Sequence, residues 1–182
     1  MSLYNSAHDP AGRLLSSTDA MGGKTSYTYN ENGNVLTSTD PNGNVTSYNY
    51  DAVGNMVKST AHDGGVTTFT YDVNNRLASS TDPEGYKTSY EYDANGNQIK
   101  SIDGRGNPST TVYDVLNRAT SNTDATGYTK RTTYNADGSV KTYTDPEGAV
   151  TSYDYDKNGN TTKITDAMGN VTTMTYDPLK GD

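Results

Sequence analysis

The sequence predicts an all-β protein, built from tandem 21-residue β-hairpin repeats that form a long antiparallel ribbon wound into a spiral. Three observations predict this fold class. A tyrosine-aspartate pair recurs every 21 residues, for example at Tyr50-Asp51, Tyr71-Asp72 and Tyr92-Asp93. Glycine recurs with the same period, and the segments between the glycines are rich in Thr, Tyr, Val and Ser. A fixed period of this length indicates a repeat protein, and such compositions favour strands.

Three columns of residues define the repeat. The tyrosine column begins at His8 and then contains the expected structural tyrosines Tyr29, Tyr50, Tyr71, Tyr92, Tyr113, Tyr134, Tyr155 and Tyr176. A second column contains only glycines, which we interpret as structural turn residues: Gly22, Gly43, Gly64, Gly85, Gly106, Gly127, Gly148 and Gly169. A third column contains only Gly or Asn: Gly12, Gly33, Gly54, Asn75, Gly96, Asn117, Gly138 and Gly159. Gly and Asn are the residues that adopt positive φ most easily, so the second and third columns predict tight turns.

Each repeat is predicted to contain two strands and two turns. In one copy, the first strand is Val45–Tyr50, a turn follows over residues 51–55, the second strand is Met56–Thr60, and residues 61–65 lead to the next copy. Other copies of the second turn read TDPEG. Asp accepts a hydrogen bond from the backbone two residues on, Pro presets φ at the first corner, and Gly takes the position of positive φ.

The predicted sheet has no thick core. Only 30% of the residues are hydrophobic, compared with roughly 45–50% in typical globular domains. Alternation places Thr46, Tyr48 and Tyr50 on one face of the first strand and the residues between them on the other. The repeat period then aligns one aromatic row: Tyr27, Tyr48, Phe69, Tyr90 and Tyr153. Neither face is wholly apolar, so we expect a sheet that is partly covered on each side.

Two arrangements fit two strands and two turns in 21 residues. The short connections containing Gly match hairpin loops and favour the antiparallel ribbon, whereas a parallel β-solenoid is the alternative. About 17 strands would result, and accumulated twist should wind such a long ribbon into a spiral. The predicted domain organisation is a leader or partial repeat at residues 1–7, a single array of about eight repeats at 8–177, and a truncated end at 178–182.

Composition excludes several classes of function. A net charge of −8 disfavours attraction to the phosphate backbone of nucleic acid. The chain has no Cys and therefore no disulfide framework or thiolate metal site. No apolar run is long enough to insert into a membrane, and this segment has no signal peptide.

The repeated aspartates permit two interpretations. Turn capping explains an Asp at the start of each turn, and a row of calcium sites is the alternative, because calcium binds six to eight oxygens. Against calcium, some copies have Asn30, Ala61 or Asn135 at the Asp position. The two histidines, His8 and His62, stand singly, so no base lies beside a nucleophile in the pattern. We therefore predict no catalytic residues, no cofactor and no metal site.

The motif Tyr-Asp-x-x-Gly-Asn, followed by Thr-Asp-Pro-x-Gly-Asn, resembles the Rhs family, also called the YD-repeat family. The motif is carried by Tyr92–Asn97 (YDANGN), Tyr155–Asn160 (YDKNGN) and Thr39–Asn44 (TDPNGN), and the resemblance extends from about His8 to Asp177. The resemblance implies a β-sheet spiral that forms a hollow shell, as in bacterial Rhs toxins, the C components of ABC toxins and teneurins. In the toxins this shell encloses a C-terminal toxic domain until delivery.

The chain departs from the family pattern at its C-terminal end. The resemblance implies a core segment that closes the shell and cleaves itself with aspartates, but only DPLKGD follows the last repeat. Lys180 also occupies a position where the third column has Gly or Asn in the other copies. Self-cleavage and the toxic cargo are therefore not expected in this chain.

Together these features predict a noncatalytic structural scaffold, a segment of the shell of a larger exported toxin or surface protein that encloses or displays another domain. The expected partners are further repeats and a C-terminal toxin or effector domain of the parent protein, which would be secreted or at the cell surface. Carbohydrate binding is the alternative function, because Tyr rings beside Asn, Asp and Thr offer stacking faces and hydrogen bonds to a glycan. Unpaired edge strands further predict edge-to-edge self-association.

Overall fold

A computed structural model describes residues 5–176, which form seventeen β-strands and no helix. The strands are β1 (Asn5–His8), β2 (Leu14–Thr18), β3 (Lys24–Tyr29), β4 (Val35–Thr39), β5 (Val45–Tyr50), β6 (Met56–Thr60), β7 (Val66–Tyr71), β8 (Leu77–Thr81), β9 (Lys87–Tyr92), β10 (Gln98–Ile102), β11 (Pro108–Tyr113), β12 (Ala119–Thr123), β13 (Thr129–Tyr134), β14 (Val140–Thr144), β15 (Val150–Tyr155), β16 (Thr161–Thr165) and β17 (Val171–Thr173). Residues 5–7 of the expected leader lie in β1, whereas residues 1–4, the last residue of the predicted array at 177 and the expected truncated end at 178–182 lie outside the described residues. Within residues 5–176, no helix that could cross a membrane is present.

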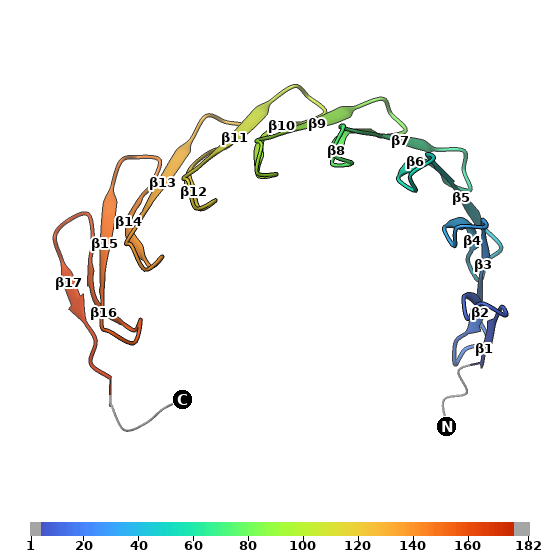
Figure 1. Cartoon of the computed structure of the whole chain (residues 1–182), viewed down its shortest axis with the longest axis horizontal. Helices are drawn as coiled ribbons and strands as arrows, with labels where there is room; N and C mark the ends of the chain where they lie inside the picture. The colour runs from blue at the N-terminus through green and yellow to red at the C-terminus, as the bar shows by residue number, and fades with distance from the viewer. Residues whose placement is uncertain (1–4, 177–182) are drawn as a thin grey trace. The chain divides into compact units, whose positions relative to one another are not determined.

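Every strand pairs with its neighbours in sequence, and the pairing is antiparallel (Figure 1). The hairpin within a repeat has four residue pairs, as in β5–β6, where the register shifts by one residue between Asn49 and Tyr50. The ladder between repeats is shorter and has three pairs, as in β6–β7. The predicted antiparallel hairpin ribbon is therefore confirmed, and the parallel solenoid is wrong because its strands would run in one direction.

The chain divides into two compact units, which are described separately. The first contains residues Met1–Ser89 with Asp103–Arg105, and the second contains Tyr90–Ile102 with Gly106–Asp182. Strand β9 contributes its first half to one unit and its second half to the other. The same repeat geometry holds in both units, while the winding of the ribbon into a spiral stays a prediction.

The two turns of each repeat have the same backbone geometry. In the loop after β5, the Gly54 N–H donates to the Asp51 carbonyl and the Asp51 N–H donates to the Asn55 carbonyl, at 3.2 and 2.9 Å. This is a type I turn followed by a residue of positive φ, a standard three-residue hairpin connection. The second-column glycines adopt φ between 83° and 89°, and in the third column Asn75 and Asn117 replace Gly at φ 60°.

The ribbon is thin and has no apolar interior. None of the hydrophobic residues in the described part of the chain is buried, and the sole buried polar residue there is Ser79, at 4% exposure. The two faces of β5 nevertheless differ, because Tyr48 and Tyr50 are half-buried whereas Val45 and Asn49 are exposed. The one-residue shift before Tyr50 is a β-bulge, which the alternation argument did not include.

The second turns of neighbouring repeats lie close together, so that one residue of each turn approaches one residue of the next. The sizes of these two residues are matched at three places. A Cβ atom on Gly23 would lie 3.2 Å from Cγ of Pro41, and a Cβ atom on Gly65 would lie 3.3 Å from Cγ of Pro83. One repeat further on, the sizes are reversed, because a Cβ atom on Gly104 would lie 2.6 Å from Cβ of Tyr86. At each of these three junctions, a glycine in one repeat thus faces a larger residue in its neighbour.

The positive φ of the turn glycines predicts a residue-specific loss of stability. Gly96 adopts φ 91°, a backbone conformation that residues with a Cβ atom adopt only with strain. We expect Gly96→Ala to lower the free energy of unfolding by about 1–2 kcal/mol. Gly96→Asn should cost less, because Asn is native at this position in the copies with Asn75 and Asn117. Urea denaturation measures both values, and equal losses for Ala and Asn would contradict the argument.

Candidate functional site

In most repeats, the tyrosine of the tyrosine column reaches back to the preceding even-numbered strand. Its hydroxyl donates to the backbone carbonyl of a residue 15 positions earlier, which is the first residue of that strand. These bonds join Tyr29 to Leu14 (2.7 Å), Tyr50 to Val35 (2.9 Å), Tyr71 to Met56 (2.9 Å), Tyr113 to Gln98 (3.3 Å), Tyr134 to Ala119 (2.8 Å) and Tyr176 to Thr161 (2.9 Å). These six tyrosines therefore link their repeats to the preceding ones.

These bonds lie where the backbone ladder between repeats has ended. In β6–β7 the last pair away from the connecting loop is Lys58 with Thr68, and Met56 lies beyond it. The Tyr71 hydroxyl therefore binds a carbonyl that lies beyond the backbone ladder between β6 and β7. A partly buried carbonyl without a hydrogen-bond partner destabilises the fold. The tyrosine side chain supplies this partner and so extends the connection between the repeats by one hydrogen bond.

The aspartate after each tyrosine holds its own loop. One oxygen of Asp156 accepts hydrogen bonds from the backbone N–H groups of Asn158 and Asn160, at 2.8 and 2.9 Å, and the other accepts one from the Asn160 side chain at 3.0 Å. The side chain and then the backbone N–H of Asn160 lower the pKa of the Asp156 carboxyl. The pKa is also lowered for Asp9, Asp40, Asp51, Asp72, Asp93, Asp114, Asp124, Asp137 and Asp166.

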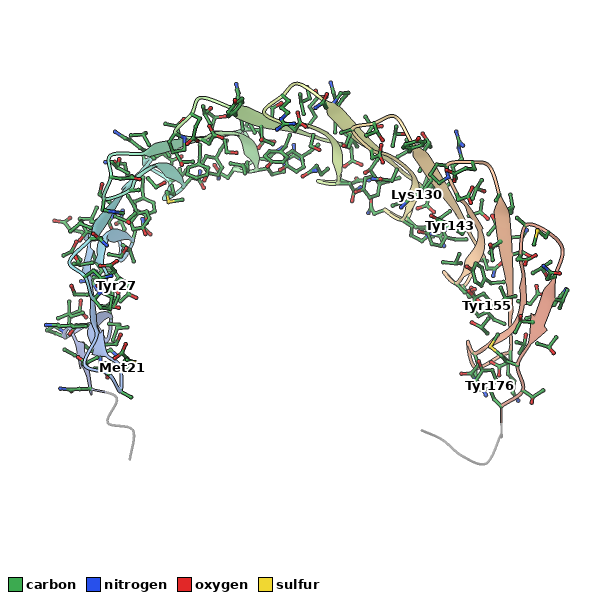
Figure 2. The ribbon with its side chains drawn as sticks, turned by 180° about the vertical axis from the view of Figure 1, so that it is seen from behind. Met21, Tyr27, Lys130, Tyr143, Tyr155 and Tyr176 are labelled. Carbon is green, nitrogen blue, oxygen red and sulfur yellow. The ribbon has the colours of Figure 1, made fainter. Side chains whose placement is uncertain are left out.

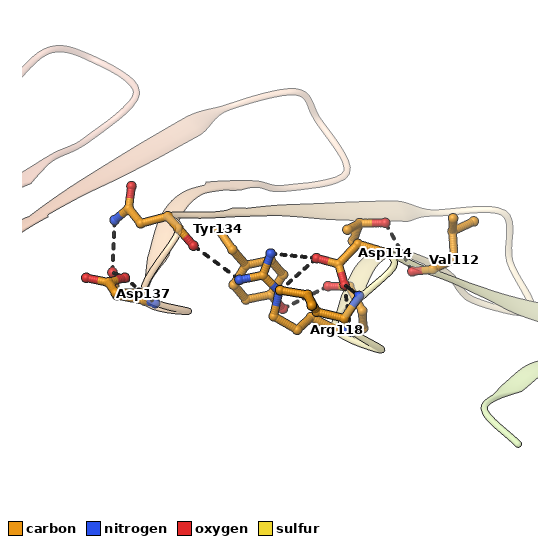
Figure 3. Close-up of polar contacts among 10 residues, drawn as sticks. Val112, Asp114, Arg118, Tyr134 and Asp137 are labelled. Atoms are coloured by element: carbon orange, nitrogen blue, oxygen red, sulfur yellow. Dashed lines mark hydrogen bonds and ion pairs between the residues drawn. The ribbon is translucent and has the colours of Figure 1, made fainter. Parts of the chain in front are cut away.

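In some repeats an arginine joins the tyrosine and the aspartate. The Arg118 guanidinium donates from Nε to Asp114 Oδ2 at 2.7 Å and from Nη1 to the carbonyl of Asn135, in the next loop, at 3.2 Å (Figure 3). Its Cζ also lies 4.5 Å from the centre of the Tyr134 ring, within the range of a cation–π interaction. Arg118 is therefore a link between two successive repeats.

The same link occurs at the start of the chain. Arg13 donates to Asp9 at 2.6 Å and to the Asn30 carbonyl at 3.0 Å, and lies 5.0 Å from the Tyr29 ring. Sequence reasoning missed these arginines. The available signal was that Arg13, Arg76 and Arg118 occupy one repeat position, directly after the third-column Gly or Asn.

The predicted structural residues all lie at the ends of strands or in loops. The glycines of the second column lie in the loops that connect repeats, and the tyrosine column ends each odd-numbered strand from β3 to β15. His8 ends β1 and His62 lies in a loop, far apart in the ribbon. Among residues 5–176, no three His, Asp or Glu side chains form a group that could hold a metal ion.

The tyrosine-bearing face is hollowed at one place in the first unit. A cavity of about 410 Å³ lies over β3 to β6, and Tyr27, Tyr48 and Tyr50 line it. In the second unit, the side chains of Tyr143, Tyr155 and Tyr176 lie along one side of the chain (Figure 2). The face that carries the aromatic row is thus half-covered by its own rings, and open at this cavity.

Comparison with protein families gives one match that covers most of the chain. The sequence profile described as RHS Repeat matches residues 8–45, 29–66, 50–85, 71–108, 134–167 and 155–180. Most consecutive segments overlap, because each is longer than one 21-residue repeat. A search of curated proteins gave no significant sequence match.

Solved structures with the same fold come from a toxin assembly. The crystal structure of TcdB2-TccC3 matches with a TM-score of 0.76, 16% identity and coverage of 97% of this chain. The same complex without its hypervariable C-terminal region matches with a TM-score of 0.76 and 17% identity. The Photorhabdus luminescens Tc holotoxin pore matches with a TM-score of 0.65, 16% identity and coverage of 98% of this chain. This chain spans 11% of the matched chain in the first two structures and 12% in the third.

The tyrosine bonds predict a measurable effect of removing a single oxygen atom. We expect Tyr71→Phe to lower the free energy of unfolding by about 1 kcal/mol, because the ring stays while the bond to the Met56 carbonyl is lost. Tyr128→Phe is the control, since that side chain is 58% exposed and lies outside the tyrosine column. Chemical denaturation of both variants tests this. Identical stability of Tyr71→Phe and the unmodified chain would show that the bond contributes nothing.

The lowered aspartate pKa values predict resistance to mild acid. The carboxyls have lower pKa values in the folded chain than the unfolded value of about 3.9, so they stabilise the fold above that pH and lose this contribution as the pH falls through the lowered values. We expect the thermal midpoint to stay level from about pH 8 to about pH 5 and to fall below about pH 4. Asp156→Asn should lower the midpoint at neutral pH and make the acid limb shallower. A steady fall between about pH 7 and about pH 5 would contradict this assignment.

Proposed function

Because the chain belongs to the RHS Repeat family, we propose that it is a noncatalytic segment of the shell of a larger exported toxin or surface protein, whose wall encloses or displays another domain. The observation that supports this most is the Tyr-Asp junction, in which the groups that could do chemistry are used to hold repeats together. The Tyr71 hydroxyl binds a backbone carbonyl, and both Asp156 oxygens bind their own loop. Such a structure builds a wall.

The absence of catalysis is part of the same proposal. A catalytic site needs a nucleophile, a base and an orienting group at one place, different from its surroundings. Here the aspartates repeat in equivalent loops, and the two histidines are separated by five strands, β2 to β6, because His8 ends β1 and His62 lies in the loop after β6. The repeated loops therefore act alike, as structural elements.

The proposed partners rest on the small share of the matched toxin chains that this chain covers. It spans 11% of the TcdB2-TccC3 chain that it matches, and one related structure was solved without a hypervariable C-terminal region. We propose that the parent protein contains further repeats and a C-terminal toxin or effector domain, and that it is secreted or exposed at the cell surface. Edge-to-edge association of separate chains stays a prediction.

Carbohydrate binding is a second candidate function, and one observation favours it. Three tyrosines surround an open cavity on the first unit, so their rings are not fully covered by one another. An aromatic ring that presents a free face beside hydroxyl groups suits a sugar. This candidate concerns one place in the ribbon and is compatible with a structural role for the rest.

The scaffold proposal is tested in the parent protein by limited proteolysis. We expect the domain next to the array to resist protease, and the double variant Tyr50→Ala/Tyr71→Ala to expose it, because both bonds to the preceding repeats are lost. Cleavage should accelerate about tenfold, since proteolysis follows the population of locally opened states. Tyr86→Ala, at a ring that is 56% exposed, is the control. Equal cleavage rates in all three proteins would contradict enclosure by the array.

A further inference from the structure

The chain contains three Asp-Gly steps, and the fold places one of them differently from the other two. The steps are Asp63-Gly64, Asp103-Gly104 and Asp137-Gly138. In such a step the backbone nitrogen of the glycine can attack the carboxyl carbon of the aspartate side chain, because glycine has no Cβ atom to hinder the approach. Whether the folded chain undergoes this reaction depends on what the glycine N–H group binds in the turn.

In two of the steps, the turn itself occupies the glycine N–H group. The Gly64 N–H donates to the Ala61 carbonyl at 3.0 Å, and the Gly138 N–H donates to the Asn135 carbonyl at 3.1 Å. Both glycines adopt positive φ, of 88° and 94°. Attack by either nitrogen would therefore break the hydrogen bond that closes the turn.

Asp103 precedes its turn instead of lying inside it. It follows directly after β10, and Gly104 is the first residue of the loop. The residue of positive φ in this loop is Gly106, at 86°, and not Gly104. Among residues 5–176, no group accepts a hydrogen bond from the Gly104 N–H. The nitrogen that would attack Asp103 is therefore not engaged by the turn.

The side chain of Asp103 is folded over the same glycine. Its Oδ1 accepts a hydrogen bond from the Arg105 N–H at 2.9 Å. This bond closes a ring of atoms that includes both the Asp103 Cγ and the Gly104 nitrogen. A cavity of about 300 Å³ adjoins these residues, with Tyr86 and Arg105 in its lining. The cyclic product of the attack therefore has room to form.

The packing of neighbouring repeats explains why glycine follows this aspartate. In the other repeats the equivalent residue is proline, alanine or histidine: Pro41, Pro83, Pro146, Ala20, Ala125, Ala167 and His62. A proline nitrogen carries no hydrogen, and the other two residue types have a Cβ atom beside the nitrogen. At Gly104, a Cβ atom would lie 2.6 Å from Cβ of Tyr86. The glycine that leaves room for Tyr86 thus also makes Asp103 reactive.

We propose that Asp103 is a modification site, at which the aspartate of the folded chain converts to isoaspartate. The Gly104 nitrogen forms a bond to the Asp103 Cγ, and the carboxyl hydroxyl leaves with the amide hydrogen as water, which gives a succinimide. Water then adds to the carbon of the former Asp103 main-chain carbonyl, and the bond from this carbon to the Gly104 nitrogen breaks. The mass is unchanged, but the main chain now runs through the Asp103 Cβ and Cγ.

The conversion changes the turn that connects β10 to β11. The carboxyl that accepts the Arg105 N–H becomes part of the main chain, so the turn loses this hydrogen bond and gains a main-chain carbon atom. A loosened turn is cleaved more readily, and trypsin would cut after Arg105. The inference concerns the covalent chemistry of the chain and goes beyond the proposed scaffold function.

The test incubates the folded chain in mildly acidic buffer, because the attack proceeds on the protonated carboxyl. Peptide mapping locates isoaspartate as a shift in retention without a change in mass, and an isoaspartate-specific carboxyl methyltransferase confirms it. We expect Asp103 to convert about fivefold faster than Asp63 and Asp137, because only these two require a turn hydrogen bond to break. In concentrated urea, where the turns are lost, the three steps should convert at similar rates.

A double variant removes the reaction while keeping the packing. Tyr86→Gly/Gly104→Pro reproduces the native pair of Gly65 and Pro83, so we expect it to fold. It should form no isoaspartate at Asp103, because the proline nitrogen carries no hydrogen. Circular dichroism establishes that the variant is folded.

Pro83→Gly is the converse variant. It places a glycine directly after Asp82, at the position that Gly104 occupies one repeat later. No clash arises, because the residue facing this position is Gly65. We expect isoaspartate to appear at Asp82, where the unmodified chain forms none.

The inference is overturned if Asp63, Asp103 and Asp137 convert at similar rates in the folded chain. It is also overturned if the double variant still forms isoaspartate at Asp103, or if Pro83→Gly forms none at Asp82. A folded chain in which Asp103 stays intact while the chain in urea converts would contradict it as well. None of these outcomes bears on the protease resistance of the parent protein, so the scaffold proposal is tested separately.

Discussion

The hydrogen bond from a tyrosine hydroxyl to a carbonyl in the preceding repeat is the interaction on which this ribbon depends. Most domains are held by apolar side chains removed from water, but no hydrophobic residue in the described part of this chain is buried. Between repeats, the backbone supplies only three residue pairs per ladder. The Tyr71 bond to Met56 adds a further connection, and its ring covers part of the sheet. Stability is thus distributed in small contributions along the chain.

This distribution determines how the ribbon opens. Each repeat contacts mainly its two neighbours, so the free energy of the array is close to a sum of repeat and junction contributions. Junctions that contain Arg13 or Arg118 have two additional contacts to the next repeat, with its carbonyl and its ring. Among the junctions with Asn at that position, Asn160 bonds within its own loop, whereas Asn55 and Asn97 also donate to the side chains of Asn75 and Asn117 in the next loop, at 3.2 and 2.8 Å. Local opening should therefore occur more readily at the Asn160 junction.

Much of the fold could be predicted because the same turn chemistry is repeated in every copy. Val45–Tyr50 and Met56–Thr60 were predicted with the bounds of β5 and β6, since Gly and Asp residues end each strand. The β-bulge before Tyr50 was not predicted, because it follows from loop closure and not from side-chain alternation. The arginine links and the cavity were also missed. Both arise where individual copies differ from the shared pattern, and reasoning from the common columns hides such differences.

The size matching at the second turns makes similar repeats unequal as building blocks. Gly23 leaves room for Pro41, whereas Tyr86 requires Gly104. A recombination event that replaced Gly104 by a larger residue while Tyr86 stayed would place a Cβ atom 2.6 Å from that of Tyr86, so the turn would have to shift. Such a change is tolerated elsewhere, because Tyr128 and Pro146 occupy the equivalent positions two repeats further on. The residues at 86 and 104 should therefore be inherited together, or the turn between them adjusted. In chimeric arrays, a crossover point within the hairpin that joins two second turns would separate the two matched residues, whereas a crossover point outside this hairpin would keep them together.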